Sequence, residues 1–124
     1  MSKKEPTRII IAGGRDESIN HERLVWLNDI METFDPDKKG SVEIVSGAAR
    51  GIDTFAIAYA RACGLIAEVF PANWDTHGKA AGPIRNRQMA EYADVCILFP
   101  GGRGTANMKS EATKAGLTIH EWTS

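Results

Sequence analysis

Short unbroken apolar runs alternate along the chain with longer stretches in which apolar residues recur every three or four positions. An unbroken run of about five apolar residues that ends at glycine, proline or a polar turn is typical of a strand buried in a parallel sheet. The pattern predicts five such strands, at Arg8–Ala12, Val42–Val45, Ile66–Phe70, Asp94–Phe99 and Leu117–Trp122.

The stretches between these runs have the period of an amphipathic helix. After the first run, one apolar stripe is formed by Leu24, Leu27, Ile30, Met31 and Phe34. Four helices are predicted, at Asn20–Phe34, from Ile52 to a stop at Gly64, from Pro83 through Tyr92, and at Thr105–Ala115. Strands and helices therefore alternate, and right-handed crossovers place the strands in one sheet. We expect a single α/β domain over residues 1–124, doubly wound, with a mainly parallel five-stranded sheet, helices on both faces and a flexible N-terminus at residues 1–7.

Composition agrees with one globular domain and narrows the choice of partners. The 124 residues are 43% hydrophobic, which suits one core without a disulfide or metal. Fifteen Lys and Arg stand against sixteen Asp and Glu, so the net charge of −1 creates no global attraction for nucleic acid. The longest apolar stretch, Ala93–Pro100, is far below the ~20 residues that span a bilayer, and Met1–Thr7 lacks the apolar core of a signal peptide. We therefore expect a cytoplasmic protein with no membrane partner, and with a local anion site rather than a nucleic-acid partner.

The cysteines and histidines indicate no metal chemistry. Cys63 and Cys96 lie in apolar runs without a His or Cys at ligand spacing, which favours two buried thiols over a zinc site or a redox pair. His21, His77 and His120 are dispersed along the chain. The sequence therefore predicts neither a metal nor a cofactor.

Three of the strand-to-helix turns are rich in glycine and carry an arginine. They read GGRD at Gly13–Asp16, SGAARGID at Ser46–Asp53 and PGGRGT at Pro100–Thr105. In a doubly wound sheet these turns share the edge at which the strands end, and ligands bind at that edge. Glycine lets a phosphate approach the backbone amides of a helix N-terminus, and arginine binds phosphate oxygens through paired hydrogen bonds. The turns therefore predict a phosphate site.

A fourth connection, Pro71–Ala81, is long for a strand-to-helix link and is expected to be a functional loop. It carries Lys79, and Trp74 could stack on a base or cover the cleft. The arginines expected at a common anion site are Arg15, Arg50 and Arg85.

These features also have purely structural interpretations. Paired glycines after a strand can serve turn geometry alone, and Asp53 could cap the second helix. Trp74 could be a half-buried anchor of its loop, and His77 a solvated side chain. As ligand-binding groups, Asp16 and Asp53 would instead accept hydrogen bonds from ribose hydroxyls or a base.

Taken together, these motifs resemble those of the YspA, YpsA-related branch of the SLOG superfamily. The resemblance runs from about Arg8 to Ile119 and includes GGRD, SGAARGID, FPANWDTHGKAAGPIRN at Phe70–Asn86, and GT-x-x-M before the last helix. It implies a Rossmann-like domain that binds or processes nucleotides or nucleotide-derived ligands such as ADP-ribose derivatives. It also implies self-association, so a homo-oligomer is expected. The superfamily includes the LOG nucleotide phosphoribohydrolases and the DNA-processing protein A group.

The chain departs from these relatives at three positions. Glu17 stands where the branch usually has an aromatic residue, and Ala48 where it has a second glycine. Met108 stands where the LOG motif PGG-x-GT-x-x-E has its glutamate. A thioether can neither transfer a proton nor stabilise a cationic sugar, so an enzyme would need another acid. The candidates are Asp16, Asp53 and Glu111.

Three functions follow from this reading. The first is binding of a nucleotide or ADP-ribose-like molecule by a sensor or sequestering protein; the alternative is a nucleoside-phosphate N-glycosidase, and a weaker alternative is a DNA-associated module. The predicted ligand-binding residues are Gly13, Gly14, Arg15, Asp16, Ser46, Gly47, Arg50, Gly51, Asp53, Trp74, Lys79, Gly82, Arg85, Asn86, Gly101, Gly102, Arg103, Gly104 and Thr105.

Overall fold

The computed structural model describes residues 6–36 and 41–123. Its strands form one sheet in the order β3-β2-β1-β4-β5, and every neighbouring pair is parallel. They are β1 (Thr7–Ala12), β2 (Val42–Ser46), β3 (Ile66–Val69), β4 (Val95–Leu98) and β5 (Thr118–Glu121). The predicted parallel five-stranded sheet is confirmed. Residues 1–5 of the expected flexible N-terminus lie outside the described residues, whereas Thr7 already pairs with Val42 in β1.

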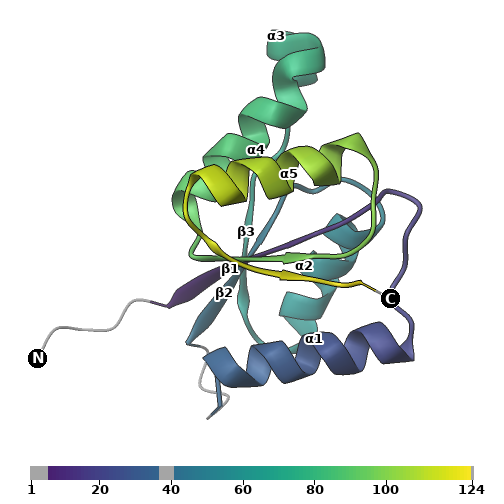
Figure 1. Cartoon of the computed structure of the whole chain (residues 1–124), viewed down its shortest axis with the longest axis vertical. Coiled ribbons are helices and arrows are strands. Elements are labelled where there is room, and N and C mark those ends of the chain that lie inside the picture. Colours follow the sequence, from purple (N-terminus) through teal and green to yellow (C-terminus); the bar gives the residue numbers. More distant parts are fainter. Residues whose placement is uncertain (1–5, 37–40, 124) are drawn as a thin grey trace, which may run out of the picture.

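Helices cover both faces of this sheet, as predicted (Figure 1). One face carries α1 (His21–Phe34) and α2 (Ile52–Ala62), and the other carries α4 (Ala81–Tyr92) and α5 (Arg103–Lys114). Asn20 is the N-cap of α1, because its side chain accepts a hydrogen bond from the Arg23 amide at 2.9 Å.

The central strand β1 explains why the sheet needs both helical layers. Ile9 and Ile11 pack into the cluster under α1 and α2, whereas Ile10 and Ala12 pack into the cluster under α4 and α5. Successive strand side chains point to opposite faces, so a strand buried on both sides must be apolar throughout. The unbroken run in the sequence is the direct result.

The strand order creates a switch point between β1 and β4. From β1 the chain moves outward through β2 to β3, then returns to β4 on the other side of β1 and continues outward to β5. The carboxyl ends of β1 and β4 are therefore adjacent while their connections diverge, and the Gly14 amide donates to the Pro100 carbonyl across this point at 2.8 Å. Ligands of doubly wound sheets bind at such a point.

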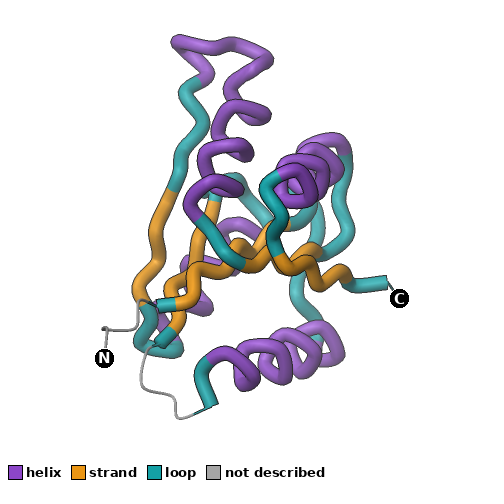
Figure 2. Tube along the Cα trace, turned by 60° about the vertical axis from the view of Figure 1, so that its left-hand side comes forward, coloured by secondary structure: helices purple, strands orange, loops and turns teal. Residues whose placement is uncertain are grey.

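The segment predicted as a long loop is mostly helical. After a short extended stretch, α3 (Trp74–His77) and the 3-10 turn η1 (Gly78–Ala80) lead directly into α4. We call α3 and η1 the arm, because they project from the body of the domain (Figure 2). Asn73 caps α3 by accepting from the Thr76 amide at 3.1 Å, and Gly78 turns the chain with φ 55°. The loop prediction was wrong because each turn is too short to show a helical period.

The two cysteines differ in burial, which corrects half of that prediction. Cys96 lies in β4 and is fully buried, and burial raises the pKa of its thiol to about 12. Cys63 is exposed, because it follows the last residue of α2 and lies beyond Ala60, which is the last buried residue of that helix.

Candidate functional site

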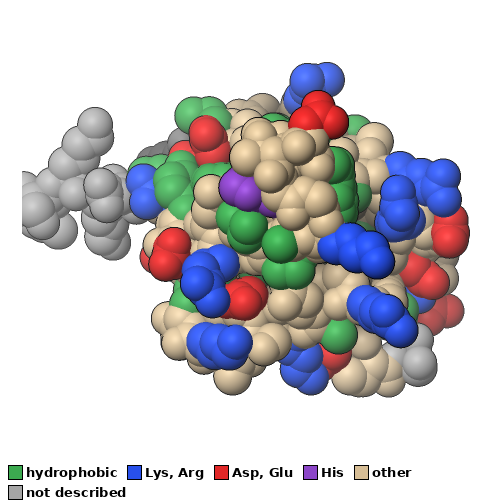
Figure 3. All heavy atoms as spheres, turned by 90° about the horizontal axis from the view of Figure 1, so that it is seen from above, with side chains coloured by type: hydrophobic (Ala, Val, Ile, Leu, Met, Phe, Trp, Pro, Cys, Tyr) green, Lys and Arg blue, Asp and Glu red, His purple; other side chains and the backbone are tan. Residues whose placement is uncertain are grey.

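A pocket of about 850 Å³ opens at the carboxyl edge of the sheet. Seen from the α3 end (Figure 3), Lys and Arg side chains, with Asp and Glu side chains among them, lie around a centre of hydrophobic side chains, a His and backbone. The turns after β1, β2 and β4, the arm and the first half of α4 all contribute to its lining. The predicted site residues that line it are Gly13, Gly14, Arg15, Asp16, Gly47, Asp53, Trp74, Lys79, Gly82, Arg85, Asn86, Gly102, Arg103, Gly104 and Thr105.

Four predicted residues lie outside this lining. Ser46 is fully buried, and its hydroxyl donates to the Asp53 carbonyl at 2.9 Å, so it stabilises the turn from below. Arg50 forms an ion pair with Asp16 at 3.3 Å and is not itself a lining residue, so of the three predicted arginines Arg15 and Arg85 line the pocket. The other two are Gly51 and Gly101.

Gly51 and Gly101 are required by the packing of the turns against one another. Gly51 has φ 81°, and a Cβ added there would lie 2.4 Å from the Gly14 carbonyl oxygen. A Cβ on Gly101 would lie 2.7 Å from the Gly14 nitrogen. The turn after β1 is therefore held between the turns after β2 and β4, with no room for side chains at the contacts.

The glycines at the start of α5 have no such packing reason. A Cβ on Gly102 or Gly104 would meet nothing within 4 Å. Gly102 is the N-cap and provides no side-chain hydrogen bond, and the first helical bond runs from the Ala106 amide to the Gly102 carbonyl at 3.0 Å. The amides ahead of Ala106 have no acceptor within the helix, and the first turn holds no acidic residue. This N-terminus is therefore open and electropositive.

Basic side chains surround the same space. Arg15, Lys79 and Arg103 line the pocket and are solvent-accessible. Arg85 is half-buried, and its guanidinium donates to the Gly47 carbonyl at 2.6 Å and to Asn86 Oδ1 at 2.9 Å. Arg85 thus fixes the second turn to α4 while adding positive charge to the pocket wall.

A pair of asparagines fixes the start of α5. The buried Asn86 side chain donates from Nδ2 to Asn107 Oδ1 at 2.9 Å and to the Gly104 carbonyl at 3.3 Å. Sequence reasoning missed Asn107, although its spacing of three residues from Gly104 places both on one side of the helix. The remaining lining residues that it missed are Ala12, Ala48, Ala49, Pro71, Ala72, Pro83 and Met89.

Asp53 is the buried acid of the pocket, with 7% of its surface exposed. Burial raises the pKa of its carboxyl to about 6, against a smaller opposing effect of Arg85 and of a hydrogen bond from the Ala49 amide at 3.4 Å. The capping interpretation is wrong, because Gly51 is the N-cap of α2 and no side chain caps the helix.

Ala48, in the same turn, has φ 63° and so adopts the left-handed conformation. This conformation favours glycine. The group of proteins that the sequence motifs resemble usually has glycine at this position. The substitution leaves the turn intact, and its backbone is held by the Ala48 amide, which donates to Ser46 Oγ at 3.2 Å.

Of the three acids considered for catalysis, Glu111 lies outside the pocket. Its carboxylate lies 3.7 Å from Arg87 and 4.0 Å from Lys114, between α4 and α5. Met108, one turn earlier, is 1% exposed and packs in the core cluster under α4 and α5 while touching the pocket. Asp16 and Asp53 are the candidates that line the pocket.

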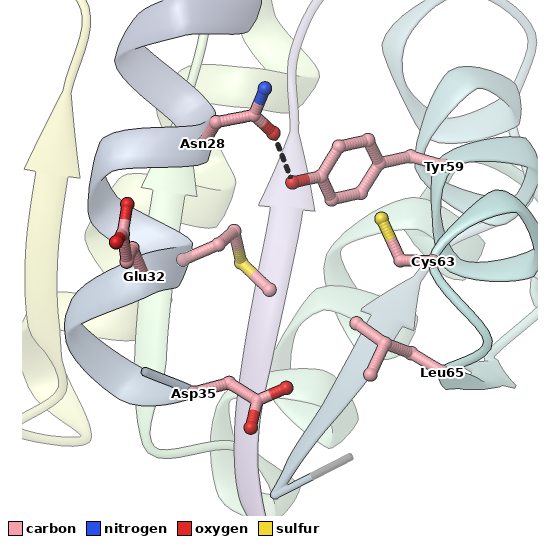
Figure 4. A pocket seen from close by; sticks show the side chains of 7 residues that line it. Asn28, Glu32, Asp35, Tyr59, Cys63 and Leu65 are labelled. Atoms are coloured by element: carbon pink, nitrogen blue, oxygen red, sulfur yellow. Dashed lines mark hydrogen bonds between the residues drawn. The ribbon is translucent and has the colours of Figure 1, made fainter. Parts of the chain in front are cut away.

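A second pocket of about 330 Å³ lies between α1 and α2 (Figure 4). Tyr59 crosses it and donates to Asn28 Oδ1 at 2.6 Å. The pKa of Tyr59 is raised by burial and by the neighbouring Cys63. Among the residues that the structure describes, its lining includes Glu32 and Asp35 but no Lys or Arg, so these residues do not suit an anion.

Two further properties concern the described residues 6–36 and 41–123. They contain no group of three or more His, Cys, Asp or Glu side chains arranged to hold a metal. None of their helices has the length and apolar character to cross a membrane.

The parallel sheet, its two helical layers and the glycine-lined turns at the switch point define a Rossmann-like α/β domain. The chain belongs to the YspA, cpYpsA-related SLOG family, whose model matches residues 7–77. The predicted family is thus confirmed, and it links the chain to nucleotide-related binding or processing.

Two known proteins are similar to the whole chain. The Gene 61 protein of Mycobacterium phage D29 is 34% identical over 120 residues, which cover 90% of this chain and 93% of that protein. The X-ray structure of DNA processing protein A from Streptococcus pneumoniae has a TM-score of 0.68 at 20% identity, over 98% of this chain and 51% of that one. The chain thus spans about half the length of the second protein, and this similarity concerns the fold.

Proposed function

We propose that the chain binds a phosphate-bearing, nucleotide-derived molecule, such as an ADP-ribose derivative, in the pocket at the carboxyl edge of the sheet. In this proposal it is a sensor or sequestering protein. The observation that carries it is the open N-terminus of α5, where Gly102 and Gly104 leave the amides accessible and no acid occupies the first turn. Such a terminus attracts anions through its free amides and the helix dipole.

The other walls of the pocket suit the rest of such a ligand. Arg15, Lys79 and Arg103 supply cations to the same pocket. Trp74 is 59% exposed and lines the same pocket, so its ring is accessible for stacking on a base. A volume of about 850 Å³ lies within the usual range for small-molecule sites.

Calorimetry with AMP and ADP-ribose tests this proposal. Arg15→Ala and Arg103→Ala should each weaken binding about tenfold or more, because charge-assisted hydrogen bonds contribute roughly 1.5–3 kcal/mol. Arg61→Ala, which removes an exposed arginine of α2 outside the pocket, is the matched control. Unchanged affinity in both pocket variants would contradict the proposal. Mass spectrometry of molecules released by the heat-denatured protein would identify a co-purifying ligand.

An N-glycosidase is the second candidate, because Asp53 places a buried carboxyl in the pocket. In such a reaction water replaces the base at the anomeric carbon, and the acid exchanges a proton with the water or the base. We expect binding without efficient cleavage, since Met108 replaces the carboxylate of the hydrolase motif. Base release from AMP, compared among the wild type, Asp53→Asn, Glu111→Ala and Met108→Glu, distinguishes the two functions; rapid release by the wild type would favour the enzyme.

A DNA-associated role is the weaker alternative, supported by the fold shared with the DNA processing protein. The net charge of −1 argues against it. A gel shift whose strength falls steeply with salt would support it.

We also propose that the chain self-associates. Ile66, Val69 and Trp74 are three large exposed apolar residues along the edge strand β3 and the arm that follows it. Analytical ultracentrifugation should show a dimer or larger closed oligomer, and a monomer at high concentration would contradict this.

The cytoplasmic location of the protein stays a prediction.

A further inference from the structure

Asp53 is the buried one of the two acids, Asp16 and Asp53, that line the pocket beside its basic side chains. It lines the pocket, yet 93% of the residue's surface is covered, since only 7% is exposed. The Asp53 carboxylate accepts a hydrogen bond from the Ala49 amide, and this bond is long at 3.4 Å. A buried carboxylate is normally satisfied by several hydrogen bonds, so this one has unused acceptor capacity.

Neither a cap on α2 nor an ion pair with Arg85 accounts for the burial of Asp53. It does not cap α2, whose N-cap is Gly51. It forms no ion pair with Arg85 within 4 Å, although both side chains border Gly47: a Cβ there would lie 2.4 Å from Arg85 Nη1 and 3.0 Å from Asp53 Oδ2. The guanidinium is used on the Gly47 carbonyl and on Asn86 instead.

The pocket therefore offers two different kinds of recognition. The start of α5, with Arg103, presents donors and positive charge, whereas Asp53 presents acceptors and negative charge from α2. A ligand that suits both must carry an anionic group and, separately, hydrogen-bond donors. Inorganic phosphate or pyrophosphate satisfies only the first requirement.

We propose that Asp53 determines specificity by accepting hydrogen bonds from the vicinal hydroxyls of a ribose phosphate, so that the pocket selects ribonucleotides over deoxyribonucleotides. This inference rests on the proposed binding function. A carboxylate has two oxygens and can accept from both hydroxyls of a cis diol, which a deoxyribose lacks. A site that hydrogen-bonds a hydroxyl discriminates against ligands that lack it, because its buried acceptor is then left unpaired.

The first experiment compares AMP with 2′,3′-dideoxy-AMP by calorimetry on the wild-type protein. We expect AMP to bind at least tenfold more tightly. In Asp53→Asn this ratio should fall to near one, because a neutral amide forms weaker bonds with hydroxyls, while the affinity for the dideoxy nucleotide is retained. Asp29→Asn makes the same chemical change on the exposed surface of α1 and should keep the wild-type ratio.

The pH dependence of the ratio provides a second readout that a structural role would not produce. Arg15, Asp16, Lys79, Arg85 and Arg103 also face the pocket, and the phosphate itself titrates. These effects are common to both nucleotides and cancel in the ratio. The preference for AMP should therefore decrease as Asp53 is protonated, and should not change with pH in Asp53→Asn.

The outcomes separate this inference from the proposed function. Equal binding of AMP and dideoxy-AMP by the wild type would overturn the role of Asp53 while leaving the phosphate site in place. A preference for AMP over inosine monophosphate that is lost in Asp53→Asn would overturn it in favour of the base amino group. If the wild type binds neither these nucleotides nor ADP-ribose, the proposed function itself is wrong.

Discussion

The helices α2 and α5 start at the same edge of the sheet after similar glycine-rich turns, but their N-termini differ in almost every physical respect. At α2 the Ile52 amide donates to the Gly14 carbonyl at 3.4 Å, and an acid, Asp53, lies in the first turn. At α5 the amides have no helical acceptor, no acid is present, and Gly102 and Gly104 border open space. The first terminus thus packs against a neighbouring turn, whereas the second remains open.

This contrast shows that glycine serves two purposes in one site. Gly51 allows two turns to touch, whereas Gly104 keeps a helix end accessible. The residue type alone does not distinguish these purposes, but the space around each Cα does. The difference can be tested by placing side chains at each terminus.

The largest effect is expected for Gly51→Ala. The new Cβ would lie 2.4 Å from the Gly14 carbonyl oxygen, at φ 81°. Strain and overpacking together should lower the free energy of unfolding by about 3 kcal/mol or more. Gly104→Ala, in open space within a helix, should instead be neutral or raise it by up to about 1 kcal/mol. Urea denaturation of the two variants measures the comparison, and similar losses in both would break it.

The next effect concerns the acid at the α2 terminus. Because the pKa of Asp53 is raised from 3.8 to about 6, the folded chain holds a proton between pH 4 and pH 6 that the unfolded chain has lost. The free energy of unfolding should therefore fall as the pH rises through this range, by up to about 3 kcal/mol. Asp53→Asn should remove this dependence and stabilise the protein at pH 7.

Thermal unfolding at several pH values measures the effect of Asp53, with Asp29→Asn as control. Loss of stability in Asp53→Asn at pH 7 would mean that the carboxylate stabilises the fold. A gain in stability together with a loss of ligand discrimination is the pattern of a residue kept for binding.

A smaller difference, in the affinity for AMP, is expected between the alanine variants of two arginines. Arg103 lies in the first turn of α5 and lines the pocket, whereas Arg50 precedes α2 and pairs with Asp16. Arg103→Ala should weaken AMP binding by about 1.4 kcal/mol, or tenfold, and Arg50→Ala by less than half of that. Equal losses by calorimetry would place Arg50 at the anion site after all.

The smallest effect concerns Ala48→Gly in the turn before α2. Glycine removes the penalty of φ 63° but increases the flexibility of the unfolded chain. The two effects nearly cancel, so we expect the free energy of unfolding to rise by between zero and about 1 kcal/mol. Urea denaturation would detect a larger gain, and a loss would show that the alanine methyl group makes a stabilising contact.

The sequence predicted most of the fold because the central strands β1, β2 and β4 are buried on both faces. Ile9, Ile10 and Ile11 form an unbroken run only because each face of β1 is covered. The helical arm was missed, since Trp74–His77 is one turn long and exposes its side chains. Such a segment carries no period of buried residues.

The sequence also predicted most of the residues that line the candidate site. Glycine-rich turns after strands located the pocket edge, because parallel strands end together. The ion pair of Arg50 with Asp16, the burial of Asp53 and the bond between Asn86 and Asn107 depend on contacts between elements far apart in the chain. No local pattern encodes them.

The arm also affects how the pocket moves. The residues of α3 and η1 bury no side chain, and these two segments pack mainly on each other and on α4. Their amide hydrogens should therefore exchange with solvent through local opening, while those of β1 exchange only when the whole domain unfolds. A ligand that contacts Trp74 and Lys79 would slow exchange in the arm far more than in the sheet, so that deuterium uptake reports occupancy of the pocket from one short segment.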